Sequence, residues 1–451
     1  MTPGARLQAA AELLGAVWGG TTPPDVLMDD YFRQRRYAGS SDRRAIQERI
    51  YGVLRRRARL SWWVERTGID LGHEGAAPDP RALLIAALTL EDRTSPDEVA
   101  GLFSGGRHCP AALSTGEADL AEALYGRPLN HAEMPPDVAY EFPAWMTDAF
   151  TSLWGGRLAE ELAALNETAP VDLRANTLRT TREEAKLALA RAFVETAETP
   201  FSPLGLRVEG RPRLGGTEAF KQGLVEIQDE GSQLLALLTD ARPGMTVVDY
   251  CAGVGGKTLA LAAAMGRDGR VAGKLIACDI SRTRLDRLRP RLKRAGAHQV
   301  KCRVISAQDD NWVAEQAGRA DRVLVDVPCT GTGTWRRDPN AKWRFTPTDL
   351  DDLVERQRRI LTDAQAMVRP GGRLVYATCS LLQTENERQM AWFLEHFPRF
   401  QALPIDRVWS ETIGGAPPPT GPGLRLTPAS TGTDGFFCSV LESSVSPCKT
   451  S

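Results

Sequence analysis

The chain has 451 residues, of which 42% are hydrophobic, and its 56 basic and 57 acidic side chains leave a formal net charge of −1. This composition is typical of a globular protein with large buried cores, and it excludes a mostly disordered chain and a uniformly cationic coat on nucleic acid. The apolar runs, such as Leu234–Leu238, are too short to cross a bilayer, and the N-terminal residues do not resemble a secretory signal. The eight cysteines are scattered without close pairs, so we expect a cytoplasmic protein with neither a disulfide framework nor a bound metal.

Residues 1–165 are predicted to form a helical domain. Apolar residues recur at helical spacing in Leu7–Val17 and in Ile46–Val64. Residues 33–59, here named the arginine cluster, hold ten arginines and only two acidic side chains. Two interpretations of the arginine cluster stay open at this point: a solvated helix face, or a surface that contacts nucleic-acid phosphates.

Residues 166–225 are predicted to form a small α+β subdomain. Val171–Asn176 and Leu204–Val208 have the pattern of strands. Between them, Thr181–Phe193 has the pattern of a helix, with two glutamates in its first turn.

Residues 226–451 show apolar strands that alternate with amphipathic helices, which predicts βαβ units and a mainly parallel sheet. The predicted strands are Thr246–Tyr250, Lys274–Asp279, Lys301–Ile305, Arg322–Val327, Arg373–Thr378 and Phe436–Leu441. The predicted helices are Lys257–Met265, Arg282–Ala295, Leu350–Val368 and Glu385–Phe397. Ligands of such sheets bind beyond the carboxyl ends of the strands. The Gly-, Pro- and Thr-rich residues 413–433 are predicted to form a loop.

The segment Asp249–Thr258 combines a strand end, a glycine-rich turn and a helix start. Three kinds of ligand-binding turn have this general pattern. A phosphate-binding P-loop would need a glycine at Cys251, and a dinucleotide fingerprint would need one at Thr258. S-adenosylmethionine fits better, because glycine lets its methionine part approach the backbone and an acidic strand end suits its amino group. A purely structural tight turn is the alternative.

An acidic residue also ends the second predicted strand, and another follows the third. Asp279 is placed to accept hydrogen bonds from ribose hydroxyls, and Asp309 is placed near an adenine edge. A single aspartate in such a position is more often a helix cap. Together with Asp249 they form a series at successive strand ends, which favours a nucleoside-like ligand.

Two cysteines follow the fourth and fifth predicted strands, at the sheet edge where the methyl donor is expected. Cys329 lies in Asp326–Thr334, and Cys379 lies in Thr378-Cys379-Ser380. A cysteine at a strand end is usually part of the packing. Two cysteines beside small and hydroxylated residues favour accessible thiols in a cleft.

A thiolate beside a methyl donor suits methylation of carbon 5 of a pyrimidine. Addition of the thiolate to carbon 6 makes carbon 5 nucleophilic, which splits one difficult reaction into easier steps. The thiolate needs an electropositive setting. Lys257 and the basic residues within 336–344 are expected to provide it and to hold a nucleic-acid backbone.

These motifs resemble the signatures of the Sun/Fmu (RsmB-type) RNA cytosine-5 methyltransferases. The resemblance covers most of the chain and includes a weaker similarity of Arg49–Arg55 to the NusB-like domain of bacterial members. The other matching segments are Asp172–Leu178, Gln228–Gln233, Asp249–Thr258, Asp326–Trp343, Thr378–Ser380 and Glu385–Glu387.

The resemblance implies a fold and a set of residue roles. The fold is α/β, with a Rossmann-like S-adenosylmethionine-dependent methyltransferase domain at 226–451, a small α+β (RRM-like) subdomain at 166–225 and an all-α NusB-like domain at 1–165. The implied substrate is RNA, and ribosomal RNA in particular. Cys379 corresponds to the nucleophile and Cys329 to the cysteine that assists product release. The implied cofactor contacts are Cys251, Ala252, Gly253, Val254, Gly255, Gly256, Lys257, Asp279, Asp309 and Asp326.

Two departures from the family pattern and two rival functions remain. Gly253-Val254 stands where the family has Ala-Pro, and Thr330 stands where it has serine. One rival is a DNA cytosine-5 methyltransferase, in which Cys329 would be the nucleophile. The other is a non-catalytic RNA-binding assembly factor with a decayed methyltransferase fold. The presence of both thiols and all the acidic strand ends speaks against decay.

Overall fold

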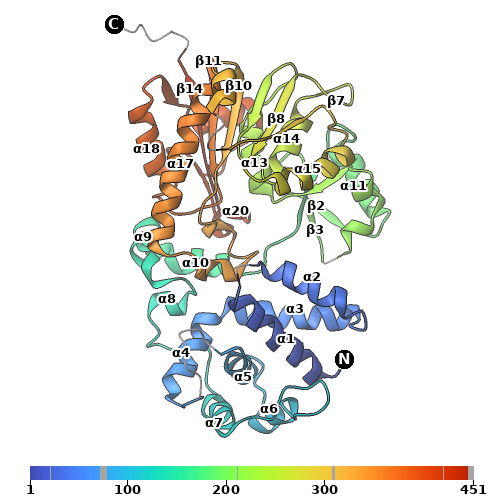
Figure 1. Cartoon of the computed structure of the whole chain (residues 1–451), viewed down its shortest axis with the longest axis vertical. Coiled ribbons are helices and arrows are strands. Elements are labelled where there is room, and N and C mark those ends of the chain that lie inside the picture. Colours follow the sequence, from blue (N-terminus) through green and yellow to red (C-terminus); the bar gives the residue numbers. More distant parts are fainter. Residues whose placement is uncertain (21, 72–78, 211, 307–309, 420, 445–451) are drawn as a thin grey trace. The chain divides into compact units, whose positions relative to one another are not determined.

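The computed structural model describes the whole chain except residues 21, 72–78, 211, 307–309, 420 and 445–451 (Figure 1). The described residues divide into two compact units. The first unit comprises Met1–Asn166 and Trp335–Phe345, and the second comprises Glu167–Thr334 and Thr346–Ser451. The short segment 335–345 thus belongs structurally to the N-terminal unit, although in sequence it directly follows the loop that contains Cys329 and ends at Thr334.

The first unit is helical, as the sequence predicts. Its α5 is buried along Ala82–Leu90, and Asp79 caps it by accepting hydrogen bonds from two backbone N–H groups of its first turn. Apolar faces of the surrounding helices pack on α5 and form one core. The helices of this unit are α1 Pro3–Trp18, α2 Pro24–Gln34, α3 Ser40–Arg55, α4 Arg57–Thr67, α5 Pro80–Leu90, α6 Pro96–Leu102, α7 Thr115–Leu124, α8 Pro136–Ala139, α9 Thr147–Trp154 and α10 Leu158–Asn166.

The second unit begins with a small antiparallel sheet in the order β2-β3-β1-β4. The strands are β1 Asp172–Ala175, β2 Thr196–Glu198, β3 Gly205–Val208 and β4 Val225–Ile227, with helices α11 Arg182–Ala190 and α12 Glu218–Lys221. Asn176, in the motif that follows β1, donates from its amide nitrogen to the carbonyls of Gly223 and Ala295 at 2.8 and 2.9 Å. It thereby ties the small sheet to the end of helix α15 (Arg282–Ala295), which packs on the large sheet.

The large sheet has the order β12-β14-β11-β10-β5-β8-β9, with β13 paired to β14. The five strands from β11 to β9 in this order are parallel, and β12, β13 and β14 are antiparallel additions. All six predicted strands are present. The strands are β5 Thr246–Asp249, β8 Lys274–Asp279, β9 Lys301–Val304, β10 Ala320–Asp326, β11 Val368–Thr378, β12 Phe400–Ala402, β13 Leu424–Leu426 and β14 Phe436–Ser443, and β6 Gly266–Arg267 and β7 Arg270–Val271 form a separate hairpin.

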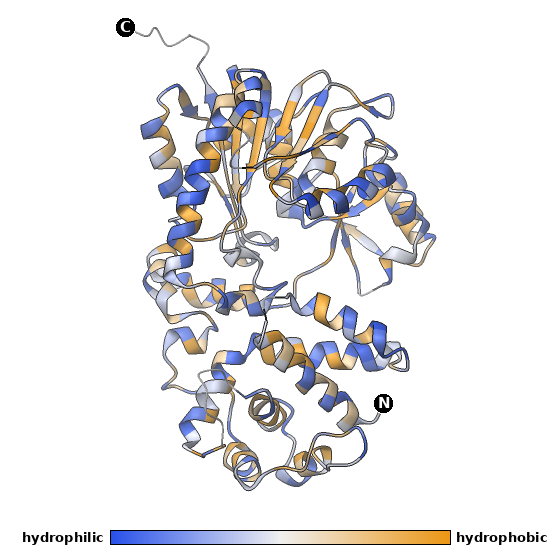
Figure 2. Ribbon diagram, in the orientation of Figure 1, coloured by the Kyte–Doolittle hydropathy of each residue, from blue (hydrophilic) through white to orange (hydrophobic). Residues whose placement is uncertain are grey.

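Helices cover both faces of this sheet. Val247 and Leu324 face one apolar core with α14 and α15, whereas their strand neighbours Val248 and Val325 face a second core with α17. Figure 2 shows the resulting hydrophobic strands between helices that are hydrophilic on their outer sides. The helices are α13 Glu230–Leu238, α14 Gly256–Ala264, α15, α16 Asp310–Glu315, α17 Pro347–Met367, α18 Glu387–His396, α19 Ile405–Thr412 and α20 Pro428–Thr431. No helix in the described part of the chain is long and apolar enough to span a membrane.

The loop prediction for residues 413–433 is wrong in part. This stretch contains β13 and α20. Leu424 and Leu426 of β13 are fully buried against the sheet, where β13 pairs with β14. A strand of three residues is too short to show an alternating pattern among glycines and prolines.

Candidate active site

The glycine-rich turn connects β5 to α14 at the carboxyl edge of the large sheet. Gly253 and Gly255 have positive φ angles of 56° and 87°, which L-residues with side chains rarely adopt. A Cβ atom at position 255 would lie only 2.0 Å from the Cδ1 atom of Leu288. The turn therefore requires glycine at position 255 for both its backbone conformation and its contact with α15.

Asp279, at the end of β8, holds this turn in place. Its Oδ2 atom accepts a hydrogen bond from the Gly253 N–H at 2.9 Å, and its Oδ1 atom accepts one from the Ser281 N–H at 2.7 Å. The side chain is almost fully buried. A carboxylate has about four acceptor positions, so Asp279 retains capacity for ribose hydroxyls while it orients the turn.

Asp249, at the end of β5, has one satisfied oxygen and one free oxygen. The Thr258 hydroxyl donates to Oδ2 at 2.6 Å, whereas Oδ1 is buried and has no hydrogen-bond partner among the described residues. Burial raises the pKa of Asp249 to about 7, although the Thr258 hydroxyl acts in the opposite direction. A buried acceptor of this kind fits a cationic amino group, such as that of the methionine part of S-adenosylmethionine.

Lys257 and Asp326 form an ion pair beside the thiols, with 2.7 Å between Nζ and Oδ2. Lys257 is buried in α14, whereas the Asp326 side chain is 31% exposed. Burial alone would lower the pKa of Lys257, but the carboxylate of Asp326 and the nearby thiol of Cys379 raise it overall. The lysine therefore keeps a positive charge next to Cys379.

The two cysteines lie side by side because β10 and β11 are neighbouring parallel strands with Asp326 opposite Ala377. Their Sγ atoms are 3.4 Å apart, and both residues are free and partly exposed. The hydrogen bond with Cys379, together with burial, raises the pKa of the Cys329 thiol well above its usual value. Cys329 therefore remains a protonated thiol next to the Sγ atom of Cys379.

A buried carboxylate, to which the sequence pattern assigns no role, joins the two cysteine loops. Glu385 accepts hydrogen bonds from the backbone N–H and the hydroxyl of Thr330, from the Ser380 hydroxyl and from the Gln357 amide. Thr330 and Ser380 each directly follow one of the two cysteines. In the sequence, the only indication of a shared acceptor is that a hydroxyl residue follows each of the two cysteines.

The backbone adds a second connection between the same loops. The Gly333 N–H donates to the carbonyl of Cys379 at 2.9 Å, and the Gly435 N–H donates to the carbonyl of Gly333 at 2.8 Å. A Cβ atom on Gly333 would lie 2.1 Å from the Gly435 carbonyl oxygen. The glycine at 333 thus permits the close approach to Gly435, while its N–H group connects the loop after Cys329 to Cys379.

The structure brings most of the predicted site residues to this one edge. Burial raises the pKa of the Cys251 thiol well above its usual value, and its role as a cofactor contact stays a prediction. Asp309 lies outside the described residues. Among the described residues, no group of three or more His, Cys, Asp and Glu side chains could hold a metal ion.

In two basic segments, side chains that the sequence suggests are exposed are instead buried or paired within the protein. The sequence predicts that Arg336 and Lys342 hold a nucleic-acid backbone, but both are buried in the first unit, where the Lys342 Nζ donates to the Asn166 side chain at 2.7 Å. In the arginine cluster, Arg56 pairs with Glu91 and Arg59 pairs with Glu141. These arginines therefore stabilise the helical unit.

Other members of the arginine cluster have different surroundings. The guanidinium of Arg57 lies over the rings of Trp18 and Trp343, at 5.6 and 5.4 Å from their centres. Arg36 and Arg44 are exposed. The cluster is thus partly internal and partly a solvated surface.

Two family models and several known proteins are similar to this chain. The family model described as 16S rRNA methyltransferase RsmB/F matches residues 236–442, and the model described as an RsmF/B-like, ferredoxin-like domain matches residues 142–214. The chain is 30% identical to a "Probable ribosomal RNA small subunit methyltransferase B" of Synechocystis sp. over 89% of this chain and 91% of that protein. It is 28% identical to ribosomal RNA small subunit methyltransferase B of Sodalis glossinidius, over 90% of this chain and 91% of that protein.

A solved structure shows the same fold over about two thirds of the chain. The crystal structure of a methyltransferase homolog protein from Pyrococcus horikoshii matches with a TM-score of 0.58 and 26% identity. The match covers 68% of this chain and 97% of that one. The predicted combination of a Rossmann-like domain, a small α+β subdomain and a helical N-terminal region is therefore confirmed, and the α+β subdomain is similar to a ferredoxin-like domain.

Proposed function

We propose that this chain, which belongs to the RsmB/F family of S-adenosylmethionine-dependent methyltransferases, methylates carbon 5 of a cytosine in ribosomal RNA through a covalent bond to Cys379. The observation that carries the proposal is the pair of thiols 3.4 Å apart beside the Lys257–Asp326 ion pair. The choice of ribosomal RNA rests on the names of the relatives. The choice of carbon 5 rests on the chemistry of the thiols.

We assign the cofactor contacts from the residues at the sheet edge. The turn 251–257 and Asp279 would hold the nucleoside and methionine parts, and the free oxygen of Asp249 would accept the amino group. Asp309 and Asp326 remain proposed contacts. When bound, S-adenosylmethionine supplies an electrophilic methyl group on a sulfonium.

The proposed reaction starts at the base. The Cys379 thiolate forms a bond to carbon 6 of cytosine, and the electron pair of the ring double bond moves so that carbon 5 becomes nucleophilic. Carbon 5 would then take the methyl group from the sulfonium, so that the new carbon–carbon bond forms as the methyl–sulfur bond breaks and leaves a neutral thioether. Loss of the carbon 5 proton to water and breakage of the bond between Cys379 and carbon 6, whose electron pair returns to the Cys379 sulfur, restore the aromatic ring and release the enzyme.

The environment supports different roles for the two thiols. Lys257 places a positive charge near Cys379, which is the electropositive setting that a nucleophilic cysteine needs. Cys329 keeps its proton, so its thiol is placed to hydrogen-bond to the sulfur of Cys379 and to assist departure of that sulfur. The roles agree with those that the family resemblance implies.

A trapping experiment tests the proposal and separates it from both rivals. RNA and DNA of the same sequence carry 5-fluorocytosine, whose fluorine cannot leave as a proton does, so the adduct to the true substrate persists. We expect an RNA adduct that needs S-adenosylmethionine and is absent in Cys379→Ala. An adduct to DNA alone would favour a DNA methyltransferase, and binding of RNA without adduct or methylation would favour an assembly factor.

A further inference from the structure

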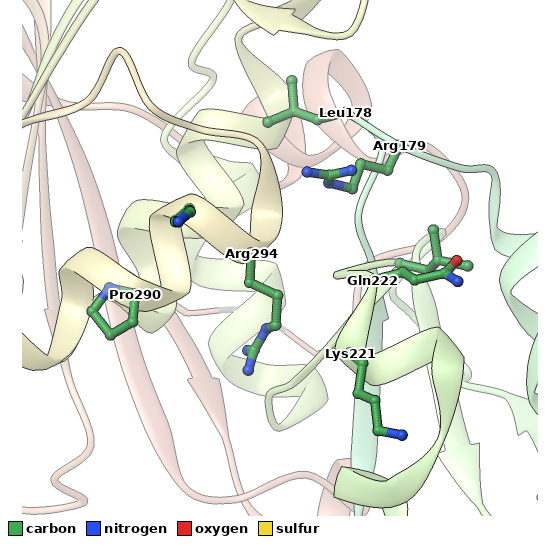
Figure 3. A pocket seen from close by; sticks show the side chains of 8 residues that line it. Leu178, Arg179, Lys221, Gln222, Pro290 and Arg294 are labelled. Carbon is green, nitrogen blue, oxygen red and sulfur yellow. The ribbon is translucent and has the colours of Figure 1, made fainter.

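A basic pocket of about 780 Å³ lies in the second unit, between the small sheet and the last turns of α15. Figure 3 shows Arg179 and Gln222 on one wall and Pro290 and Arg294 on the other. Four lining side chains are basic and none is acidic. The complete lining is Leu178, Arg179, Lys221, Gln222, Leu224, Pro290, Lys293 and Arg294.

One of the four basic side chains is fixed by the protein itself. Arg294 donates to Glu226 of β4 at 2.5 Å, and its guanidinium lies 4.2 Å from the ring centre of Phe220. Glu226 is buried and also accepts a hydrogen bond from Arg291 at 3.1 Å. Arg294 therefore forms a rigid part of the pocket wall and shares the negative charge of Glu226 with Arg291.

The remaining cations are available to a ligand. Arg179 and Lys293 are exposed, and neither side chain has a hydrogen-bond or ion-pair partner among the described residues. Lys221 has only a surface pair with Glu218, which lies one turn away on α12. The pocket thus presents uncompensated positive charge from two chain segments that are far apart in sequence.

The pocket wall is bonded to the proposed cofactor turn. Arg291, one turn before Arg294 on α15, donates to the carbonyl of Val254 at 2.7 Å as well as to Glu226. A ligand in the pocket would consequently be held on the same unit as the glycine-rich turn, at a fixed place relative to it.

We infer that this pocket binds the phosphodiester backbone of the RNA substrate, outside the nucleotide that is methylated. The inference rests on the proposed function for the identity of the substrate. Charge complementarity favours a polyanion, since α15 continues the positive surface with six arginines and a lysine against the single acidic Asp286. The open, wide pocket with separated cations suits successive phosphates of a strand better than one small anion.

The test compares two double variants with equal changes in charge. Arg179→Gln/Lys293→Gln removes the two unpartnered cations and leaves Arg294 and its contacts intact. The matched control, Arg356→Gln/Arg359→Gln, removes two exposed cations from α17, which packs on β10 and β11, away from β8 and β9 beside α15. Binding to an in-vitro transcript of small-subunit ribosomal RNA is measured over a range of salt concentrations, together with S-adenosylmethionine affinity and thermal unfolding.

The pocket variant should bind the RNA roughly tenfold more weakly, and its log–log salt slope should be smaller by about 0.7 for each phosphate that it no longer neutralises. Its cofactor affinity and melting temperature, and all properties of the control variant, should match those of the wild type. Equal RNA affinity and slope in the pocket variant, alongside normal RNA methylation by the wild type, would overturn the inference alone. Absence of RNA methylation by the wild type would overturn the proposed function as well.

Two further binding experiments identify what the pocket recognises. Inorganic phosphate at constant ionic strength should not displace the RNA, and displacement at low concentration would assign the pocket to a free anion instead. If the pocket variant binds naked RNA normally but binds assembled small subunits poorly, the pocket contacts a ribosomal protein and the inference is wrong.

Discussion

The Sγ atoms of Cys329 and Cys379 lie 3.4 Å apart, at the carboxyl ends of two neighbouring parallel strands. Neither strand alone determines this distance. Glu385 accepts hydrogen bonds from the residue that follows each cysteine, and Gly333 bonds to the carbonyl of Cys379. The relative position of the two thiols is thus set by a buried network that belongs to both loops.

Glu385→Gln tests this network. The amide offers one acceptor oxygen where the carboxylate has two, so at least one donor from Thr330, Ser380 or Gln357 loses its partner. We expect a destabilisation of roughly 1–3 kcal/mol in chemical unfolding. A role in positioning the thiols further predicts that kcat falls while KM for RNA stays near its wild-type value. Unchanged kcat at a reduced melting temperature would make Glu385 purely structural.

Asp279→Ala tests the ribose contact. Loss of the carboxylate should weaken S-adenosylmethionine binding by roughly 1–3 kcal/mol, because hydroxyl groups and the Gly253 N–H are left without an acceptor. Titration calorimetry measures the affinity. Asp286→Ala, an exposed aspartate on the adjacent helix α15, is the matched control and should bind the cofactor normally. Wild-type affinity in Asp279→Ala would remove this residue from the site.

Because Asp249 is buried, we expect the stability of the cofactor-free protein to depend on pH. Burial raises its pKa from 3.8 to about 7, so the folded state binds a proton more tightly than the unfolded state. The free energy of unfolding should therefore fall as the pH rises from about 4 to about 7, by at most about 1.4 kcal/mol per pH unit from this group. Above about pH 7 this contribution no longer changes with pH.

The Asp249→Asn variant isolates this contribution. Its stability should lose this part of the pH dependence, and its affinity for S-adenosylmethionine should fall because the acceptor for the amino group has lost its charge. Urea unfolding at several pH values, with and without cofactor, measures both effects. The same slope between about pH 5 and about pH 7 in variant and wild type would show that Asp249 does not titrate in this range.

The sequence alone predicts those parts of the fold in which apolar residues recur with a clear period or in which a known motif occurs. Six strands of the large sheet are predictable because they are apolar runs or, in β9, an alternation of polar and apolar residues, and parallel topology then brings Cys329 and Cys379 to one edge. β13 and β4 have only three residues each, too few for a period. Their conformation is decided by pairing, of β4 with the distant β1 and of β13 with the next strand, β14.

Long-range partners limit the prediction of the site. A buried lysine or arginine cannot be recognised from local spacing, so the sequence suggests exposed cations at Lys342 and Arg336 although the helical unit buries them. Likewise, Glu385 gains its role only when the loops at Thr330 and Ser380 meet around it. Such roles depend on contacts between residues about 50 or more positions apart.

Separate replacement of the two cysteines provides the sharpest test of the mechanism. Cys379→Ala should abolish methylation and leave no covalent RNA complex, because carbon 5 is never activated. Cys329→Ala retains the attacking thiol and its neighbour Lys257, so attack and methyl transfer should proceed while elimination is impaired. This variant should accumulate an RNA adduct that survives denaturing electrophoresis and disappears on ribonuclease treatment. Cys302→Ala, at a partly exposed cysteine on β9, is the control and should behave as wild type. An adduct in Cys379→Ala but not in Cys329→Ala would exchange the two roles, and full methylation by both variants would exclude the covalent mechanism.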